Sequence, residues 1–201
     1  MSSTVLYMSM SLDGFITGPN EGPDNALGDG GHRLHAWAMG TDPDQSGKHG
    51  LARDLSGADR EVVEEMMSTG AVLAGRGTFE PAGGWNGDHH DGVPIFILSR
   101  HEPSPDFARF PAVTYISDLE SAVRQAREAA GDKDVLVHGS SIAQWTLAAG
   151  LLDELQIHLV PVLLGEGRRL FEQLGTEPRE LETIRVLRGR DATHLRYRVR
   201  R

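Results

Sequence analysis

The sequence contains no cysteine, which excludes disulfide bonds, thiolate nucleophiles and zinc sites built on sulfur. No apolar run approaches the ~20 residues that a membrane-spanning helix needs. Basic residues are in the minority, and the net charge of −9 opposes long-range attraction to nucleic acids and anionic membranes. Residues 1–10 lack the basic segment that opens a secretory signal. We therefore expect a cytoplasmic protein that binds neither nucleic acid nor membrane.

The 201 residues are enough for one well-buried core and few for two, so we expect a single domain over residues 1–201. Residues 4–11 read as an opening strand. Three further runs, 71–74, 95–98 and 135–137, are apolar at every position. Strands that are buried on both faces have this composition, so the runs predict a parallel sheet core.

Two segments, 56–70 and 117–131, carry apolar residues at helical spacing. Each segment opens with a serine followed three positions later by an acidic residue, which is the capping-box pattern. The second helix lies between two of the predicted strands. This order is typical of a βαβ unit and of an α/β fold.

The end of the chain has the pattern of antiparallel strands. Residues 155–162 predict a strand, and residues 181–187 and 193–199 predict a hairpin around 188–191. In the last strand apolar residues alternate with His194 and three arginines, which predicts one buried face and one solvated face. The whole order predicts a mixed, mainly parallel sheet with a C-terminal antiparallel hairpin.

A glycine-rich segment follows the predicted strand 71–74. Gly75, Arg76 and Thr78 stand where a helix would begin. Such a helix start directs free N–H groups and the positive end of the helix dipole at a phosphate. Arg76 would add charge and Thr78 a hydrogen bond. The alternative is a plain strand-to-helix turn capped by Thr78.

A second glycine junction follows the strand 135–137. Gly139 permits close approach of the backbone to a ligand, and Ser140 or Ser141 can cap the next helix. The inner face of that helix is expected to consist of Ile142, Trp145 and Ala149. Two such junctions at the carboxyl ends of parallel strands suit a dinucleotide with its separated phosphates.

The segment Leu98, Ser99 and Arg100 ends another predicted strand. A serine and an arginine at this place could hold a 2′-phosphate, which favours NADPH over NADH. The alternative is an arginine that is simply solvated.

Two residues are candidates for proton chemistry. His138 ends a buried strand directly before Gly139, and an imidazole titrates near neutrality. It would donate a proton to the substrate or, alternatively, fill space as a neutral ring. Asp13 would either orient groups near the reacting centre or stabilise the turn that it forms with Gly14.

The segment 88–91 contains metal-ligand residue types, including His89 and His90. Adjacent residues in an extended loop point in opposite directions, and no third distant ligand is evident. We therefore predict no metal site.

The segments 11–16, 75–80, 98–100, 139–141 and 150–167 occur in an order that resembles the dihydrofolate reductase superfamily. The sequence is most similar to the C-terminal reductase domain of the bifunctional riboflavin-biosynthesis deaminase/reductase. The resemblance implies a dihydrofolate reductase-like, three-layer α/β/α fold, bound NADPH and frequently a homodimer. It further implies hydride transfer to a small nitrogen heterocycle of the pterin or pyrimidinone type.

Carried over residue by residue, the resemblance also implies a cofactor site. Its expected members are Ser9, Ile16, Thr17, Gly18, Gly75, Arg76, Thr78, Leu98, Ser99, Arg100, Gly139, Ser140, Ser141 and Ile142. Two positions depart from the family pattern. The stretch 32–37 has no acidic residue where dihydrofolate reductase has its proton donor, and His138 replaces a glutamate that is usual in riboflavin-type reductases.

Residues 17–57 form a long connection rich in glycine, proline, aspartate and histidine, with only residues 34–39 of helical character. So long a connection is typical of a lid or a binding loop. Three functions remain open: an NADPH-dependent reductase, a nucleotide-binding module without turnover, and a metal-dependent hydrolase that uses His89 and His90. The two phosphate-type junctions favour the first two. For the homodimer we expect the apolar segment 155–164 to contribute.

Overall fold

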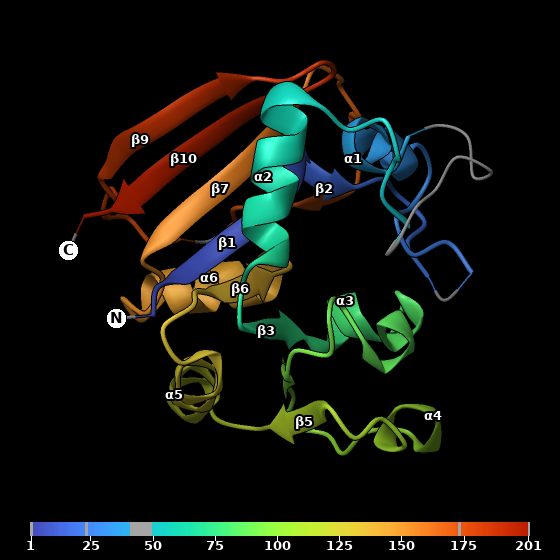
Figure 1. The fold of residues 1–201 in the computed structure, drawn as a ribbon, viewed down its shortest axis with the longest axis vertical. Helices are drawn as coiled ribbons and strands as arrows, with labels where there is room; N and C mark the ends of the chain where they lie inside the picture. Colours follow the sequence, from blue (N-terminus) through green and yellow to red (C-terminus); the bar gives the residue numbers. More distant parts are fainter. Residues whose placement is uncertain (1, 23, 41–49, 173, 201) are drawn as a thin grey trace.

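The chain folds around an eight-stranded sheet with the strand order β5-β4-β3-β6-β1-β7-β10-β9 (Figure 1). The computed structural model describes residues 2–22, 24–40, 50–172 and 174–200. The strands are β1 (Thr4–Ser11), β3 (Ala71–Gly75), β4 (Ile95–Leu98), β5 (Val113–Ile116), β6 (Val135–His138), β7 (Glu154–Val160), β9 (Leu181–Arg188) and β10 (Thr193–Val199). The first six strands of this order, from β5 through β4, β3, β6 and β1 to β7, pair in parallel with their neighbours. Strand β10 pairs antiparallel with β7 and β9. The expected mixed, mainly parallel sheet with its C-terminal hairpin is confirmed.

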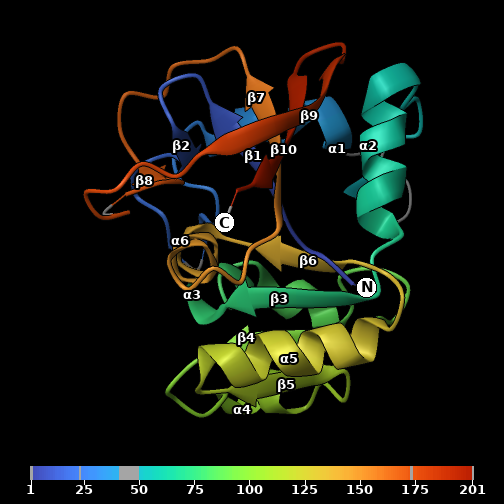
Figure 2. The same ribbon diagram turned by 90° about the vertical axis from the view of Figure 1, so that its left-hand side faces the viewer.

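Helices cover both faces of the sheet (Figures 1 and 2). The helices α5 (Leu119–Ala130) and α6 (Ser140–Ala148) pack on one face. The other face carries α1 (Ala36–Met39), α2 (Gly57–Met67), α3 (Arg76–Phe79) and α4 (Pro105–Ala108). Short 3-10 helices, η1 (Gly31–Leu34) and η4 (Gly83–Gly87), and a small sheet of β2 (Phe15–Thr17) and β8 (Arg168–Arg169) complete the described elements. The expected three layers are therefore present.

The central strands form because their residues are apolar on both faces. Val72 and Leu73 in β3 and Leu136 in β6 are fully buried. Burial of such a side chain contributes roughly 1.5–3 kcal/mol, so these strands anchor the core. Strand β5 escaped prediction because it lies at the sheet edge, where Thr114 is exposed and no apolar run marks it.

The expected helix caps differ in detail from the observed ones. The N-cap of α5 is Asp118, not Ser117, and its carboxylate accepts a hydrogen bond from the Ser121 N–H at 2.8 Å. Ser56 is the N-cap of α2 but makes no side-chain capping bond. The N-cap of α6 is Gly139, so the expected serine cap is absent there. Gly139 has no side chain to cap the first N–H groups of α6.

The inner face of α6 also differs from the expected one. Trp145 has 51% of its surface exposed and Ala149 is exposed as well. The buried residues of the helix are Ser140, Ile142, Ala143, Thr146 and Leu147. The sheet contact therefore lies about one residue away from the predicted stripe, because Thr146, whose hydroxyl bonds the Ile142 carbonyl, faces inward.

The polar face of β10 is covered at His194 and Arg196, which corrects half of the prediction for the last strand, while the Arg198 side chain on the same face is 55% exposed as expected. His194 is 1% exposed, and the Arg196 side chain is 17% exposed. Helix α2 covers this face, and its Glu65 binds both Arg185 of β9 at 2.6 Å and Arg196 at 3.2 Å. The alternation was read correctly, but the sequence did not show which helix packs on the polar side.

The long connection after β2 contains η1 and α1, and residues 41–49 of it lie outside the described part of the chain. Strand β7 ends at Val160, two residues before the predicted end. Within the described ranges, none of the helices has the length and apolar character that crossing a bilayer requires.

Candidate functional site

A cavity of about 400 Å³ lies between the sheet and helices α1 and α2, at the carboxyl ends of β1, β3 and β6. Ligands of parallel α/β sheets bind at this edge. The cavity is lined by apolar side chains with a few polar groups, which is the usual composition of a small-molecule site. Its histidines are His35, His89, His138 and His158.

The two glycine junctions meet at one side of the cavity. Gly139 has φ 100° and ψ 153°, a conformation that is nearly restricted to glycine. A Cβ atom at Gly139 would collide with the Thr78 hydroxyl, so the two junctions can approach only with glycine here. The Gly139 N–H contacts the Met8 sulfur at 3.4 Å. The N–H groups of the first turn of α6 begin directly after this junction, and a helix start of this kind suits an anion.

Part of the expected cofactor set lines the cavity. These residues are Ser9, Ile16, Thr17, Thr78 and Gly139, together with the catalytic candidate His138. The remaining expected residues do not line it; they are Gly18, Gly75, Arg76, Leu98, Ser99, Arg100, Ser140, Ser141 and Ile142. The structure thus brings together at one cavity the expected cofactor residues that lie in or directly after β1, β2, β3 and β6.

Several of the outlying residues have other contacts. Arg76 forms an ion pair with Glu80 at 2.8 Å, and the Ser99 hydroxyl donates to the His101 carbonyl at 2.8 Å. The Ile142 side chain is fully buried in the core, so only its backbone N–H could contact a nucleotide. Arg100 is exposed and forms no ion pair with the described residues.

Asp13 does not line the cavity. Its carboxylate accepts hydrogen bonds from the Ser11 hydroxyl at 2.6 Å and from the N–H groups of Leu164 and Gly165 at 3.2 and 2.7 Å. The Ser11 hydroxyl and these N–H groups lower the pKa of Asp13 to about 2. In this structure Asp13 fastens the loop after β7 to the end of β1.

His138 projects into the cavity from the end of β6. Its Nδ1 atom is buried and has no hydrogen-bond partner among the described residues. Burial lowers the pKa of His138 to about 4. Burial and then His138 lower the pKa of His35 to about 4 as well. Both rings are therefore neutral at pH 7.

The histidines of the segment 88–91 contact each other, contrary to the expectation that they point apart. Nδ1 of His89 lies 2.8 Å from Nδ1 of His90, and the ring centroids are 5.0 Å apart. Nε2 of His90 lies 3.1 Å from the Thr69 hydroxyl. Within the described ranges, no three His, Asp or Glu side chains gather in a way that would hold a metal ion.

Sequence reasoning missed His158 in β7 and its buried partners His194 and Asp59. His158 lies 3% exposed on the cavity wall, although its strand was taken as apolar. A signal was present, because Gln156 and His158 alternate with Leu155, Ile157 and Leu159. Such alternation marks a strand with one polar face.

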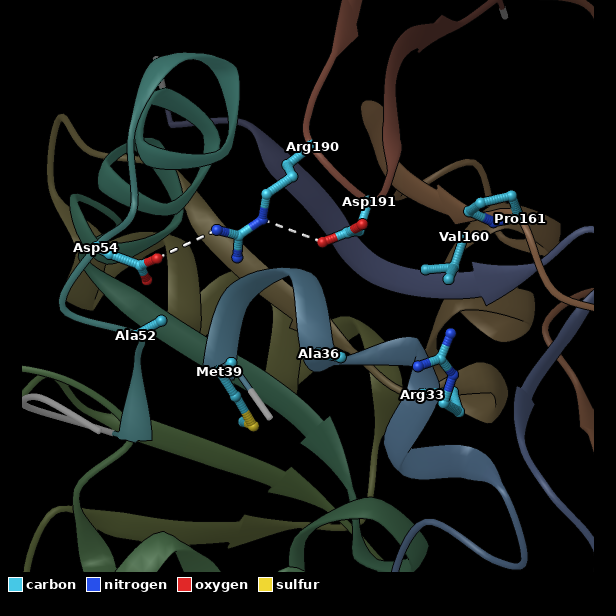
Figure 3. A pocket seen from close by; sticks show the side chains of 10 residues that line it. Arg33, Ala36, Met39, Ala52, Asp54, Val160, Pro161, Arg190 and Asp191 are labelled. Carbon is cyan, nitrogen blue, oxygen red and sulfur yellow. Dashed lines mark hydrogen bonds and ion pairs between the residues drawn. The ribbon is translucent and has the colours of Figure 1, made fainter. Parts of the chain in front are cut away.

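A second cleft of about 490 Å³ lies between α1, the end of β7 and the turn between β9 and β10. Figure 3 shows Arg190 bridging Asp54 and Asp191, each at 3.1 Å. The guanidinium charge is thus balanced by two carboxylates. This cleft contains no histidine and neither glycine junction, so the first cavity is the better candidate site.

Comparison with known proteins finds relatives over nearly the whole chain. The family model of the RibD C-terminal domain matches residues 3–195. No curated protein matches the chain. A crystal structure from Shewanella sp. PV-4, named as a riboflavin biosynthesis protein, superposes with a TM-score of 0.72 at 21% identity and covers 99% of both chains.

Two larger structures show the same fold. RibD of Acinetobacter baumannii matches all of this chain with a TM-score of 0.63 at 17% identity, and the match covers 59% of that protein. A deaminase/5-amino-6-(5-phosphoribosylamino)uracil reductase of Thermotoga maritima matches with a TM-score of 0.59 at 16% identity, over 57% of its length. The likeness shows a common dihydrofolate reductase-like fold.

Proposed function

This chain belongs to the RibD C-terminal domain family, and on that premise we propose that it is an NADPH-dependent oxidoreductase. Its substrate would be a small nitrogen heterocycle of the pterin or pyrimidinone type. The observation that carries the proposal is the cavity at the strand ends, where Gly139, Thr78 and the uncapped start of α6 meet. The aminouracil in the name of one structural relative supports a pyrimidinone.

The residues at the cavity suit a nicotinamide dinucleotide. Gly139 leaves space that a Cβ atom would fill, and the α6 N–H groups behind it suit a pyrophosphate. Ser9, Ile16 and Thr17 would hold the nicotinamide end. When bound, NADPH supplies the hydride. The apolar walls would exclude water from the reacting centre.

We retain His138 as the candidate proton donor; Asp13 would act only by orienting groups, since its carboxylate lies outside the cavity and its pKa is lowered to about 2. His138 lies in the cavity and is neutral at pH 7, since burial lowers its pKa to about 4. This neutrality is also the observation that favours the second candidate function, a nucleotide-binding module without turnover. Consumption of NADPH in the presence of oxidised pterins or aminouracils would distinguish the reductase from the binding module.

The wild-type protein is expected to bind NADPH more tightly than NADH. If Arg100 holds the 2′-phosphate, Arg100→Ala should weaken NADPH binding about 10- to 150-fold, the effect of losing one charge-assisted contact. It should leave NADH binding unchanged. Arg76→Ala should weaken both nucleotides, since a pyrophosphate is common to them. Fluorescence titration with both nucleotides measures these affinities.

The matched control is Arg124→Ala on α5. Arg124 is an exposed arginine paired with Glu128 at 3.6 Å, on a helix that contributes no residue to the cavity. It should leave both affinities unchanged. Equal affinities for NADPH and NADH in the wild type and in the Arg76 and Arg100 variants would contradict the NADPH assignment.

We also propose a homodimer, with the outer face of β9 as part of its interface. Arg185 turns toward α2, so its neighbours Ile184 and Val186 face away from the helix. They are 40% and 57% exposed, and Val186 pairs with half-buried Leu195. Exposed apolar strips of this kind mark association surfaces.

Light scattering is expected to give twice the chain mass of 21.9 kDa at micromolar concentration. Val186→Asp should shift the mass to that of one chain, because a buried charge at the interface lacks a partner. Thr114→Asp on β5, the opposite edge of the sheet, should leave the dimer intact. A wild-type mass of a single chain would refute the dimer.

A further inference from the structure

One row of polar side chains crosses three neighbouring strands on the face that α2 covers. The strand register places Ser9 of β1 beside His158 of β7, and His158 beside His194 of β10. Figure 1 shows α2 lying across this part of the sheet. The Trp37 indole N–H donates to the Ser9 hydroxyl at 3.0 Å, and its ring lies 4.5 Å from the His158 ring. Trp37 therefore packs over the row and is held there by its hydrogen bond to Ser9.

A chain of hydrogen bonds runs along this row from α2 to the cavity. Asp59 Oδ1 lies 2.9 Å from His194 Nε2, and His194 Nδ1 lies 2.8 Å from His158 Nδ1. Asp59, His194 and His158 are 6%, 1% and 3% exposed. His158 is the member that lines the cavity. A buried carboxylate is thus linked to the cavity through two imidazoles.

The hairpin turn between β9 and β10 holds Asp59, the end of this series of hydrogen bonds that lies away from the cavity. The Arg190 N–H donates to Asp59 Oδ2 at 2.9 Å. A Cβ atom at Gly189 would lie 2.7 Å from His194 Nε2 and would collide with the Asp59 carboxylate. Glycine is therefore needed at position 189 for the turn to reach the Asp59–His194 pair.

The hydrogen bonds fix the direction of each donor. An ionised carboxylate only accepts, so Asp59 requires the proton of His194 to be on Nε2. The His194 Nδ1 of a neutral ring is then an acceptor, and His158 must donate from Nδ1. A neutral His158 consequently presents Nε2 as an acceptor. Both rings are neutral at pH 7, because burial lowers the pKa of His158 and also that of His194 despite Asp59.

We propose that His158 Nε2 is a hydrogen-bond acceptor in the cavity that binds an N–H group of the substrate heterocycle. Asp59 and His194 are positioning residues that keep the proton of His158 on Nδ1 and so leave Nε2 as an acceptor. The inference rests on the proposed reductase function and deepens it. A lactam or amino N–H, as in pyrimidinones and pterins, matches the acceptor. A ring that presents a carbonyl oxygen at this point is disfavoured, because two acceptors face each other.

His138 offers no comparable control of polarity. Its Nδ1 has no hydrogen-bond partner among the described residues, and beside burial it is the Tyr7 backbone, not a carboxylate, that acts on the ring. The polarity of His158, in contrast, follows from a carboxylate two hydrogen bonds away. This difference assigns substrate orientation to His158 and leaves His138 as the candidate donor.

The tautomers can be read from nitrogen NMR of protein labelled at its nine histidines, without any ligand. We expect His194 protonated on Nε2 and His158 protonated on Nδ1. In Asp59→Asn the Arg190 N–H still needs an acceptor, so the amide oxygen should face Arg190 and the amide N–H₂ should face His194. Both tautomers should then invert, which leaves His158 with a protonated Nε2.

Asp54→Asn is the matched control, since Asp54 is 64% exposed and binds the Arg190 side chain instead. It should leave both tautomers as in the wild type. A wild-type His158 protonated on Nε2 would overturn the proposal. Unchanged tautomers in folded Asp59→Asn would overturn the role of the positioning residues. The wild-type spectrum alone decides the polarity should Asp59→Asn fail to fold.

The substrate contact is tested with 5,6-diaminouracil added to NADPH-saturated protein. We expect the His158 Nε2 resonance to shift, while that of exposed His101 stays fixed. Asp59→Asn should weaken diaminouracil binding about 5- to 150-fold, the range for an unpaired buried polar group, without changing NADPH affinity. A His158 resonance that does not move would overturn the contact. Failure to bind NADPH would instead refute the proposed function, whereas the tautomers in the free protein test the polarity of His158 independently of that function.

Discussion

Acidification from pH 7 to about pH 4 is expected to reduce the free energy of unfolding by up to about 3 kcal/mol for each of His35 and His138. Burial lowers the pKa of both rings in the folded protein from 6.5 to about 4. Between these two values the unfolded chain binds more protons than the folded one. The contribution of each neutral ring is therefore complete above about pH 6.5 and is lost as the pH falls toward 4.

Urea unfolding at a series of pH values between 7 and 4.5 measures this loss. Because carboxylates also titrate in the lower part of this range, the informative quantity is the difference between variants. His35→Gln and His138→Gln should each flatten the pH dependence, whereas His101→Gln, which changes an exposed side chain, should not. Identical slopes in all of these proteins would show that the cavity histidines are not buried as described.

Gly139→Ala is expected to lower NADPH affinity about 5- to 150-fold, because holding this junction in its binding geometry would cost an alanine on the order of 1–3 kcal/mol. The added methyl group also collides with the Thr78 hydroxyl. Relief of this contact would separate the two glycine junctions, which are the proposed nucleotide cradle. The effect should be on binding and not on the fold as a whole.

Gly131→Ala provides the matched control. Gly131 also has a positive φ, 66°, and it ends α5 away from the cavity, where a Cβ atom would meet nothing within 4 Å. Both substitutions introduce backbone strain, and only Gly139→Ala adds a collision at the site. The difference between the two variants in NADPH affinity therefore isolates the role of the junction.

Local sequence patterns were sufficient for the parallel core. Strands β3 and β6 are apolar at every buried position, and a glycine follows or ends each of them, so both the strands and the turns after them were predicted. The placement of His138 beside Gly139 at the cavity followed from the same pattern. These features depend on neighbours in the chain, which a single sequence displays.

The polar row was not predicted because its environment is made by distant residues. His194 alternates with apolar residues in β10, and the sequence alone gives no sign that α2 buries it against Asp59. Likewise, the position of Arg100 after a strand did not show that this arginine lies outside the cavity. Such placements depend on which elements pack together, and alternation alone leaves that undetermined.

The central claim is that the cavity beside Gly139 binds NADPH. The most direct measurement is a fluorescence titration of the wild type, Gly139→Ala and Gly131→Ala with NADPH, each checked for native folding. The account predicts saturation at one nucleotide per chain in the wild type and Gly131→Ala, with much weaker binding in Gly139→Ala. No saturable binding to the wild type, or equal affinity in all three proteins, would contradict it.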